Sequence, residues 1–158
     1  MSEQIEARLR TLEDREAIRE LVASYGPMAD SSDAQGIAAL FTEQGCYSVG
    51  GMGDAVGRSA IAALIEGAMH QQLVADGCAH LLGPVTIAVD GDSATARGHS
   101  VVLRNTGVGF EVFRVSANRW HFARGADGWR IIRRDNALLD GAEAARALFS
   151  PPAGRHQS

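Results

Sequence analysis

"AHLLGPVTIAVDGDSATARGHSVVLRN", residues 79–105, contains the change of periodicity that decides the fold. From about residue 78 the apolar residues recur with a period of two, which is typical of strands. The tripeptide at residues 90–92, Asp-Gly-Asp, divides this stretch into two strand candidates and is a hairpin turn signal. The sequence therefore predicts antiparallel strands from residue 78 onward.

The stretch at residues 109–139, "GFEVFRVSANRWHFARGADGWRIIRRDNALL", repeats this pattern. Its turn is "GADG" at residues 125–128, so it predicts a second pair of long strands. From Asp140 the chain holds about one helical turn, and we expect the Pro- and Gly-containing end beyond it to be flexible.

The chain before residue 78 has the period of helices. Apolar residues at helical spacing predict a first helix from about Leu12, with Pro27 near its end, where it should kink or terminate the helix. A second helix is predicted at residues 32–41, with Ser32 or Asp33 as its N-cap. The remaining elements are a short strand at 45–51 and a third helix at 57–70, capped by Ser59.

Helices followed by long antiparallel strands are typical of the α+β class. The 158 residues suit one domain with room for a sizeable core, and no repeat or linker divides them. We therefore expect a single domain over residues 1–158, with its core at about 8–141.

Composition excludes several functions. The net charge is −4 and no Lys/Arg block exists, which argues against nucleic acid and anionic membranes as partners. All fifteen basic residues are arginine, so a Schiff-base lysine is excluded. No run of about 18 apolar residues exists to span a membrane, and the charged N-terminus does not resemble a signal peptide. Cys46 and Cys78 form no metal or redox motif, so we expect a cytoplasmic protein with free thiols and no metal site.

His80 lies in the apolar run "GCAHLLGP", residues 77–84. In a strand it shares a face with Cys78 and Leu82, and the other face is also apolar, so His80 should be buried on either assignment. A buried imidazole without hydrogen-bond partners loses about 1–3 kcal/mol of solvation. A backbone carbonyl as partner would make it an ordinary core histidine, whereas a carboxylate would make it a candidate base.

Two further groups of polar residues are placed by strand periodicity. Ser116 and Asn118 share a face with apolar neighbours, where they would bind a substrate oxygen or, alternatively, form a polar dimer surface. Arg133 shares a face with Trp129 and Ile131, while Arg134 points the other way. A buried arginine needs an anion, so Arg133 is the candidate for a carboxylate substrate or an internal acid.

Three segments together resemble a known family. They are "LEDREAIRELVASYGPMADSSDAQGIAALFTEQGCYSVGG", "AHLLG" and "SANRW…DGWRIIRRDN". They resemble the SnoaL-like branch of the nuclear transport factor 2-like superfamily, which includes scytalone dehydratase, bile acid 7α-dehydratase and hexachlorocyclohexane dehydrochlorinase. The resemblance covers residues 8–141. It implies a cone in which a strongly curved, mostly antiparallel sheet wraps around three N-terminal helices, with an interior pocket and a homodimer formed by sheet faces.

The resemblance also implies site residues. The family's His–Asp dyad corresponds to His80 and to Asp30, which otherwise reads as a solvated residue at a helix end or an N-cap. The pocket tyrosine of the first strand corresponds to Tyr47, and the tyrosine five residues before the aspartate to Tyr25, which otherwise reads as a core helix residue.

Other correspondences concern the later strands. The serine and asparagine of scytalone dehydratase fall on Ser116 and Asn118, and an arginine of the last strand matches Arg133. The second catalytic histidine of scytalone dehydratase has no clear counterpart, because His99 is out of register by several residues. We interpret His70 and His121 as surface or packing residues, and place His156 in the flexible tail.

Two classes of function follow. The first is a cofactor-free lyase or isomerase acting on a small hydrophobic, cyclic molecule through the His–Asp pair. Positioned acid–base catalysis contributes about 10²–10⁴-fold, so this chemistry requires neither metal nor organic cofactor. The second is a non-catalytic ligand-binding or assembly module of the same fold, which has no need of the pair.

Overall fold

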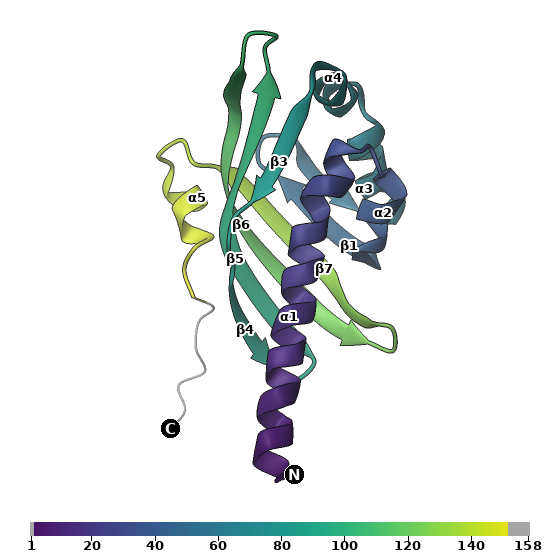
Figure 1. Cartoon of the computed structure of the whole chain (residues 1–158), viewed down its shortest axis with the longest axis vertical. Coiled ribbons are helices and arrows are strands. Elements are labelled where there is room, and N and C mark those ends of the chain that lie inside the picture. Colours follow the sequence, from purple (N-terminus) through teal and green to yellow (C-terminus); the bar gives the residue numbers. More distant parts are fainter. Residues whose placement is uncertain (1, 152–158) are drawn as a thin grey trace.

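The structure is a computed structural model that describes residues 2–151, and it has the predicted α+β order (Figure 1). The helices are α1 (Glu3–Asp30), α2 (Ala34–Ala39), α3 (Arg58–Glu66), α4 (Ala68–Asp76) and α5 (Glu143–Ala147). The strands are β1 (Phe41–Val49), β2 (Gly53–Val56), β3 (Cys78–Leu82), β4 (Thr86–Asp90), β5 (Ser93–Asn105), β6 (Phe110–Gly125) and β7 (Gly128–Leu138). None of the helices between residues 2 and 151 is both long and apolar enough to cross a membrane.

All seven strands form one curled sheet that does not close. Its order is β2-β1-β7-β6-β5-β3, and β4 pairs with the first half of β5. Neighbouring strands are antiparallel except for β1 and β7, which run parallel. Figure 1 shows α1 lying across one face of this sheet, with α2, α3 and α4 beside its upper half. The predicted curved sheet around N-terminal helices is therefore confirmed.

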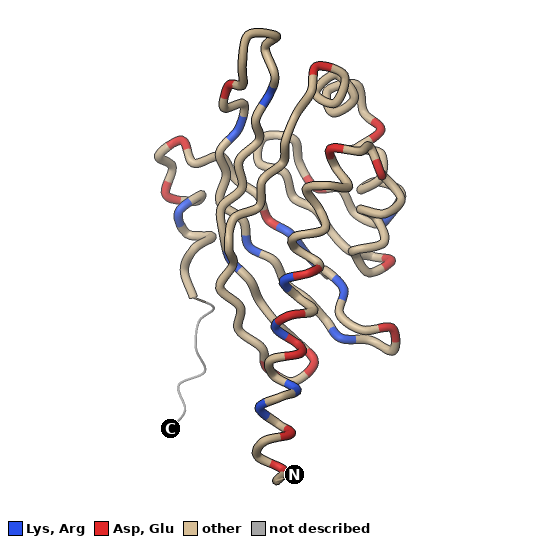
Figure 2. The backbone as a smooth tube through the Cα atoms, in the orientation of Figure 1, with Lys and Arg blue, Asp and Glu red and all other residues tan. Residues whose placement is uncertain are grey.

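Helix α1 buries an apolar stripe only in its second half. Ile18, Val22, Tyr25 and Ala29 are buried at helical spacing and pack toward the sheet. The first half is mostly exposed apart from Asp14, and Figure 2 shows both acidic and basic residues along it. The helix begins well before the predicted Leu12, because solvated charged residues extend a helix that the core already holds. It also continues past Pro27 to Asp30.

The N-terminal half differs from prediction around three glycines. The predicted helix at 57–70 is two helices, because Gly67 adopts an extended conformation between α3 and α4. Its N-cap is Gly57 at φ 86°, so Ser59 was the wrong cap. The predicted strand at 45–51 extends back to Phe41 and then turns at Gly51 into β2, which was missed. Asp33 is confirmed as the N-cap of α2, where it accepts a hydrogen bond from the Gly36 amide.

A β-bulge in β7 reverses its inward-facing side chains. Ile131 pairs with Phe122 and Arg133 with His121, so Ile132 is an extra residue without an opposite partner. Odd-numbered residues face the core before the bulge, and even-numbered residues face it afterwards. The prediction that Arg133 shares the inner face with Trp129 and Ile131 is wrong for this reason, and Arg134 takes that place.

The segment after β7 is held against the outer face of the sheet. Arg97 donates to the carbonyl of Phe149 at 2.6 Å, and Arg119 donates to the carbonyl of Leu148 at 3.1 Å. His99 packs against the Phe149 ring at 4.6 Å between ring centres. The helical turn predicted after Asp140 is therefore confirmed as α5, whereas most of the Pro- and Gly-containing end predicted to be flexible lies outside the described residues. His156, which was placed in that end, also lies outside them.

Gly26 permits the contact that positions the site. A Cβ at this position would lie well inside van der Waals contact of the His80 carbonyl oxygen. Without a side chain, the last turns of α1 can lie directly against β3, which places Asp30 beside His80.

We predict that Gly26→Ala destabilises the protein by about 1–3 kcal/mol, because the added methyl group overpacks the contact between α1 and β3. Urea unfolding at fixed pH measures the change. The matched control is Gly125→Ala, where a Cβ would meet no atom within 4 Å, and its effect should stay within about 0.5 kcal/mol. Helix propensity alone favours alanine over glycine by about 1 kcal/mol, so a stabilised Gly26→Ala variant would contradict the close approach.

Candidate active site

A cavity of about 130 Å³ lies between the helices and the inner face of the sheet. An apolar protein cavity of about 150 Å³ is known to hold a benzene molecule, so this volume suits one small ring. The apolar part of its wall includes Leu64, Ile65, Leu73, Leu82, Val102 and Phe113. The polar part includes Tyr25, Tyr47, His70, His80, Arg134 and Asn136. The polar groups are few, as is usual in small-molecule sites.

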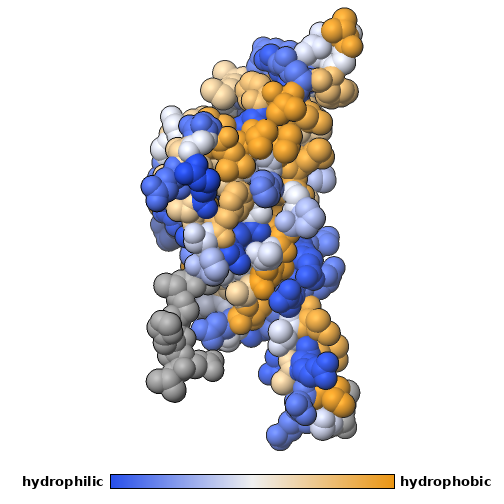
Figure 3. Space-filling view, turned by 90° about the vertical axis from the view of Figure 1, so that its left-hand side faces the viewer, coloured by the Kyte–Doolittle hydropathy of each residue, from blue (hydrophilic) through white to orange (hydrophobic). Residues whose placement is uncertain are grey.

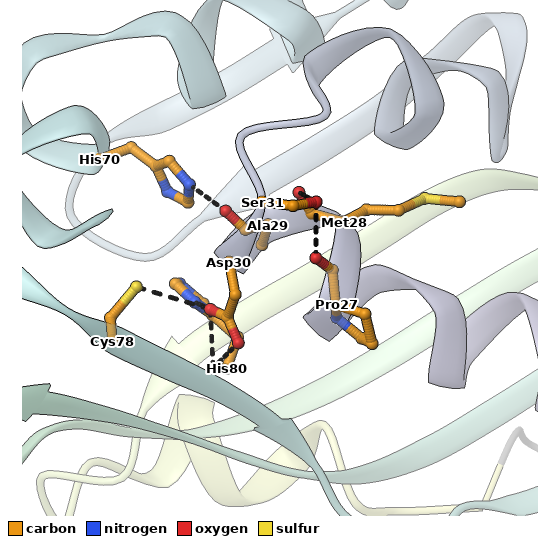
Figure 4. Close-up of polar contacts among 8 residues, drawn as sticks. All are labelled: Pro27, Met28, Ala29, Asp30, Ser31, His70, Cys78 and His80. Atoms are coloured by element: carbon orange, nitrogen blue, oxygen red, sulfur yellow. Dashed lines mark hydrogen bonds and ion pairs between the residues drawn. The ribbon is translucent and has the colours of Figure 1, made fainter. Parts of the chain in front are cut away.

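His80 and Asp30 form a close pair at the wall of this cavity. The Nδ1 atom of His80 lies 2.7 Å from the Oδ1 atom of Asp30 (Figure 4). The His80 backbone N–H also donates to both carboxylate oxygens, at 3.1 Å each. A carboxylate only accepts hydrogen bonds, so Nδ1 carries the proton and Nε2 has the free lone pair. Asp30 therefore fixes the tautomer in which Nε2 is a base.

The surroundings of His80 keep its imidazole neutral. Its side chain is 11% exposed, and burial lowers its pKa below the ordinary value. The hydrogen bond and charge of Asp30 oppose this lowering, while His70 and Arg134 add to it. At neutral pH the ring is consequently unprotonated and able to accept a proton.

Cys78 is the third residue at this pair. Its Sγ atom donates to Asp30 Oδ1 at 3.5 Å, and burial, together with Asp30, raises the pKa of the thiol to about 11. The thiol is therefore protonated and is a hydrogen-bond donor rather than a nucleophile. Within residues 2–151, Asp30, Cys78 and His80 are the one group whose ligand atoms lie close enough to hold a metal ion. A metal there would have to displace the Asp30–His80 hydrogen bond.

Two aromatic residues and a second histidine surround His80. The rings of Tyr25 and Tyr47 meet edge to face with centres 6.2 Å apart, and Tyr25 meets the His80 ring in the same way at 6.3 Å. Burial raises the pKa of the Tyr25 hydroxyl, so it remains a proton donor. The His70 ring lies 5.3 Å from that of His80, and its Nε2 atom bonds the Ala29 carbonyl oxygen (Figure 4). His70 therefore lines the cavity, although the sequence suggested a surface or packing residue.

Arg134 is the fully buried cation of the cavity wall, at 2% exposed, and the partly buried Arg114 is the second arginine of that wall. Its Nε and Nη2 atoms donate to Asn118 Oδ1 at 3.0 and 2.9 Å. Its Cζ atom lies 4.3 Å from the ring centre of Tyr25 and 4.6 Å from that of Tyr47. The sequence-based prediction assigned a cavity arginine to Arg133, and the bulge in β7 explains the exchange.

Ser116 and Asn118 support the cavity wall from behind instead of lining it. Both are fully buried on the inner face, which excludes the alternative of a polar dimer surface. Asn118 accepts from Arg134 and Asn136 and donates to Ser100, whereas Ser116 accepts from Arg114. Their predicted contact with substrate is not supported, because neither is among the residues that form the cavity.

Three other candidates lie away from the cavity. Arg133 forms ion pairs with Asp54 and Asp135 at 3.5 and 2.8 Å, on the other side of the sheet from Arg134. His99 packs on the C-terminal segment, and His121 pairs with Arg133 on the strand face that does not contribute to the cavity. The site therefore contains Asp30, His80, Tyr25 and Tyr47 as predicted positions, and Arg134 and His70 as additions.

Known proteins share this fold and sequence pattern. The SnoaL-like domain family matches residues 10–135. An NTF2-like protein with a cystatin-like fold from Novosphingobium aromaticivorans is 60% identical, with a TM-score of 0.91 over 93% of this chain and 96% of that one. A protein of unknown function from Mycobacterium tuberculosis is 27% identical, with a TM-score of 0.72 over 87% and 76%.

A structure from Catenulispora acidiphila in complex with S-DNPA is 21% identical, with a TM-score of 0.67 over 77% of this chain and 90% of that one. At this identity it shows the likeness of the folds. No curated protein matches the chain.

We predict that the imidazole of His80 titrates below its ordinary pKa of about 6.5, and that Asp30→Asn lowers the midpoint further. The hydrogen bond and charge of Asp30 favour the imidazolium, so their removal leaves burial unopposed. NMR titration of the histidine Cε1–H signals measures both values.

The control is Asp54→Asn. It removes an exposed carboxylate of β2 that pairs with Arg133 of β7. It should leave the His80 midpoint unchanged. An increase in the His80 pKa in Asp30→Asn would contradict the pair.

Proposed function

Because this chain belongs to the SnoaL-like family of the nuclear transport factor 2-like superfamily, we propose that it is a cofactor-free lyase or isomerase. Its substrate is a small hydrophobic, cyclic molecule that carries an acidic C–H bond beside a carbonyl group. The observation that carries this proposal is the 2.7 Å contact between His80 Nδ1 and Asp30 Oδ1 at the wall of a mostly apolar cavity.

The proposed reaction starts with proton transfer to His80. Its Nε2 atom removes the proton of the C–H bond, and the electron pair moves onto the carbonyl oxygen to form an enolate. Asp30 stabilises the imidazolium that forms, through Nδ1–H. In a lyase the enolate then expels a leaving group from the neighbouring carbon, and the imidazolium returns its proton to that group. In an isomerase the same proton returns to another carbon.

The developing negative charge needs hydrogen-bond donors. Tyr47 and Tyr25 line the cavity, and the raised pKa of Tyr25 keeps its hydroxyl protonated. We assign these hydroxyls to the substrate oxygen, with Tyr47 as the catalytic donor. Donors that are already in place before the charge forms need no reorganisation during the reaction.

The alternative function is a ligand-binding module without chemistry. The structure of the protein from Catenulispora acidiphila is in complex with S-DNPA, which supports small-molecule binding in this fold. The His–Asp pair favours the enzyme, because a carboxylate that fixes one imidazole tautomer serves proton transfer and adds little to the binding of an apolar ring.

We predict that the protein accelerates elimination of water from single-ring β-hydroxyketones, and that His80→Ala and Asp30→Asn each remove most of this activity. A positioned general base contributes about 10²–10⁴-fold, so losses of that order are expected. The conjugated enone product is followed by its ultraviolet absorbance. Circular dichroism and thermal unfolding establish that each variant is folded.

His99→Ala is the matched control, because this histidine packs on the outer face of the sheet. It should retain full activity. Full activity in folded His80→Ala would refute the base. If ligands bind in the cavity and none of the β-hydroxyketones is converted, the protein is a ligand-binding module.

We also propose that the protein is a cytoplasmic homodimer. Leu81, Val101 and Val115 are cross-strand neighbours on β3, β5 and β6, and Leu81 and Val115 are exposed. Figure 3 shows hydrophobic side chains gathered on this side of the molecule. Contiguous exposed apolar surface is typical of an interface. Both cysteines are free thiols, which suits a reducing compartment.

Light scattering at micromolar concentration should therefore give twice the 16.7 kDa mass of one chain. Val115→Asp should shift the mass toward that of the monomer, because a carboxylate at the interface would be buried without a partner. His121→Asp, a change to the same residue elsewhere on the sheet, is the control for a general effect of charge. A monomeric mass for the unmodified chain would exclude this dimer.

A further inference from the structure

Arg134 is a buried cation that lacks an acidic partner. None of the ion pairs among residues 2–151 involves it. Its Nη1 atom is the one buried side-chain nitrogen or oxygen atom in this part of the chain that has no hydrogen-bond partner. Its other contacts are the amide oxygen of Asn118 and the faces of three aromatic rings, from Tyr25, Tyr47 and Trp120.

These contacts hold the guanidinium in place without neutralising it. Asn118 Oδ1 is an uncharged acceptor, and it is shared with Asn136. The ring faces attract the cation, but they accept no strong hydrogen bond from Nη1. A charge buried in this way is stabilised fully only when an anion joins it. Because Arg134 lines the cavity, a ligand in the cavity can supply that anion.

We propose that Arg134 binds the carboxylate of a single-ring hydrophobic substrate, and that the cavity selects such anions over neutral molecules of the same shape. This inference rests on the proposed function, because it names the substrate class of that same cavity. The carboxylate pairs with the guanidinium of Arg134, because hydrogen bonds between two charged groups are the strong ones, and the ring packs against Leu64, Ile65 and Phe113.

The geometry places both ends of such a ligand within reach. The Tyr25 ring contacts both groups, with its centre 4.3 Å from Arg134 Cζ and 6.3 Å from the centre of the His80 ring. A ligand of one ring and one carboxylate can therefore span the wall between Arg134 and His80. The cavity volume of about 130 Å³ also suits a ligand of about one ring.

The bound anion also changes the base. The charged and titratable groups around His80 are Asp30, Cys78, His70, Arg134 and Tyr25. Burial disfavours the imidazolium most, and His70 and Arg134 add to that effect. A carboxylate on Arg134 compensates its charge. His80 should therefore become a stronger base when the correct ligand is bound, which couples substrate recognition to proton transfer.

The test compares benzoate with benzamide, a neutral molecule of nearly the same shape. Calorimetric titration into the full chain should show benzoate binding at least tenfold more tightly. Arg134→Gln should abolish this preference, and Arg133→Gln, the neighbouring arginine on the opposite face, should retain it. Equal affinity for the two probes, or an unchanged preference in folded Arg134→Gln, overturns the proposal.

A second measurement needs no variant. Saturating benzoate should raise the midpoint of the His80 NMR titration in the unmodified chain, and benzamide should leave it in place. An unchanged midpoint with bound benzoate overturns the coupling even if Arg134→Gln does not fold.

These outcomes are independent of the catalytic test. Benzoate preference with no turnover in any assay rejects the proposed enzyme and keeps the anion site. Turnover that depends on His80, without any preference for benzoate, supports the proposed enzyme and rejects the anion site.

Discussion

The close approach of helix α1 to strand β3 is the contact on which the rest of the site depends. The two elements are joined by almost fifty residues of chain, and they touch where Gly26 leaves room for the His80 carbonyl. That contact brings the end of α1 beside the strand, so the Asp30 carboxylate can accept from both the backbone N–H and the ring of His80. The backbone hydrogen bonds are important here, because they fix the carboxylate independently of the imidazole. The ring can therefore change its protonation state without losing its partner.

The sheet contributes a second, separate constraint. The bulge at Ile132 turns Arg134 inward, where Asn118 and the rings of Tyr25, Tyr47 and Trp120 hold it. The cavity thus has a neutral base on one wall and an unneutralised cation on another, both within an apolar enclosure of low dielectric response. Electrostatic interactions are strong in such surroundings. Burial is the main reason that the imidazole stays unprotonated, and the positive charge adds to it. An anion bound beside the cation would strengthen the base. In the arrangement that we propose, charge couples binding to proton transfer.

Sequence reasoning succeeded where the signal was local or repeated. Strand periodicity placed the hairpins at residues 90–92 and 125–128, and it placed Ser116 and Asn118 on one shared face, which the structure shows to be the inner one. It failed at single-residue irregularities. A strict period of two cannot contain the extra residue in β7, so it chose Arg133 over Arg134. Gly67 gave no sign that it would divide a helix in two, and His70 on the second half was therefore not recognised as a cavity residue.

By itself the sequence determined the α+β class, the order of helices and strands, and, through its resemblance to a family, the identities of Asp30, His80, Tyr25 and Tyr47. These predictions depend on periodicity and on motifs, which are local features of the sequence. The tertiary structure decided which side chains share the cavity, which arginine is buried, and how Asp30 reaches His80. Those outcomes depend on the sheet register, on the bulge in β7 and on the close contact between α1 and β3 at Gly26. Pairings between residues far apart in the sequence depend on strand register and on packing in three dimensions. Local patterns along the chain therefore do not reveal them.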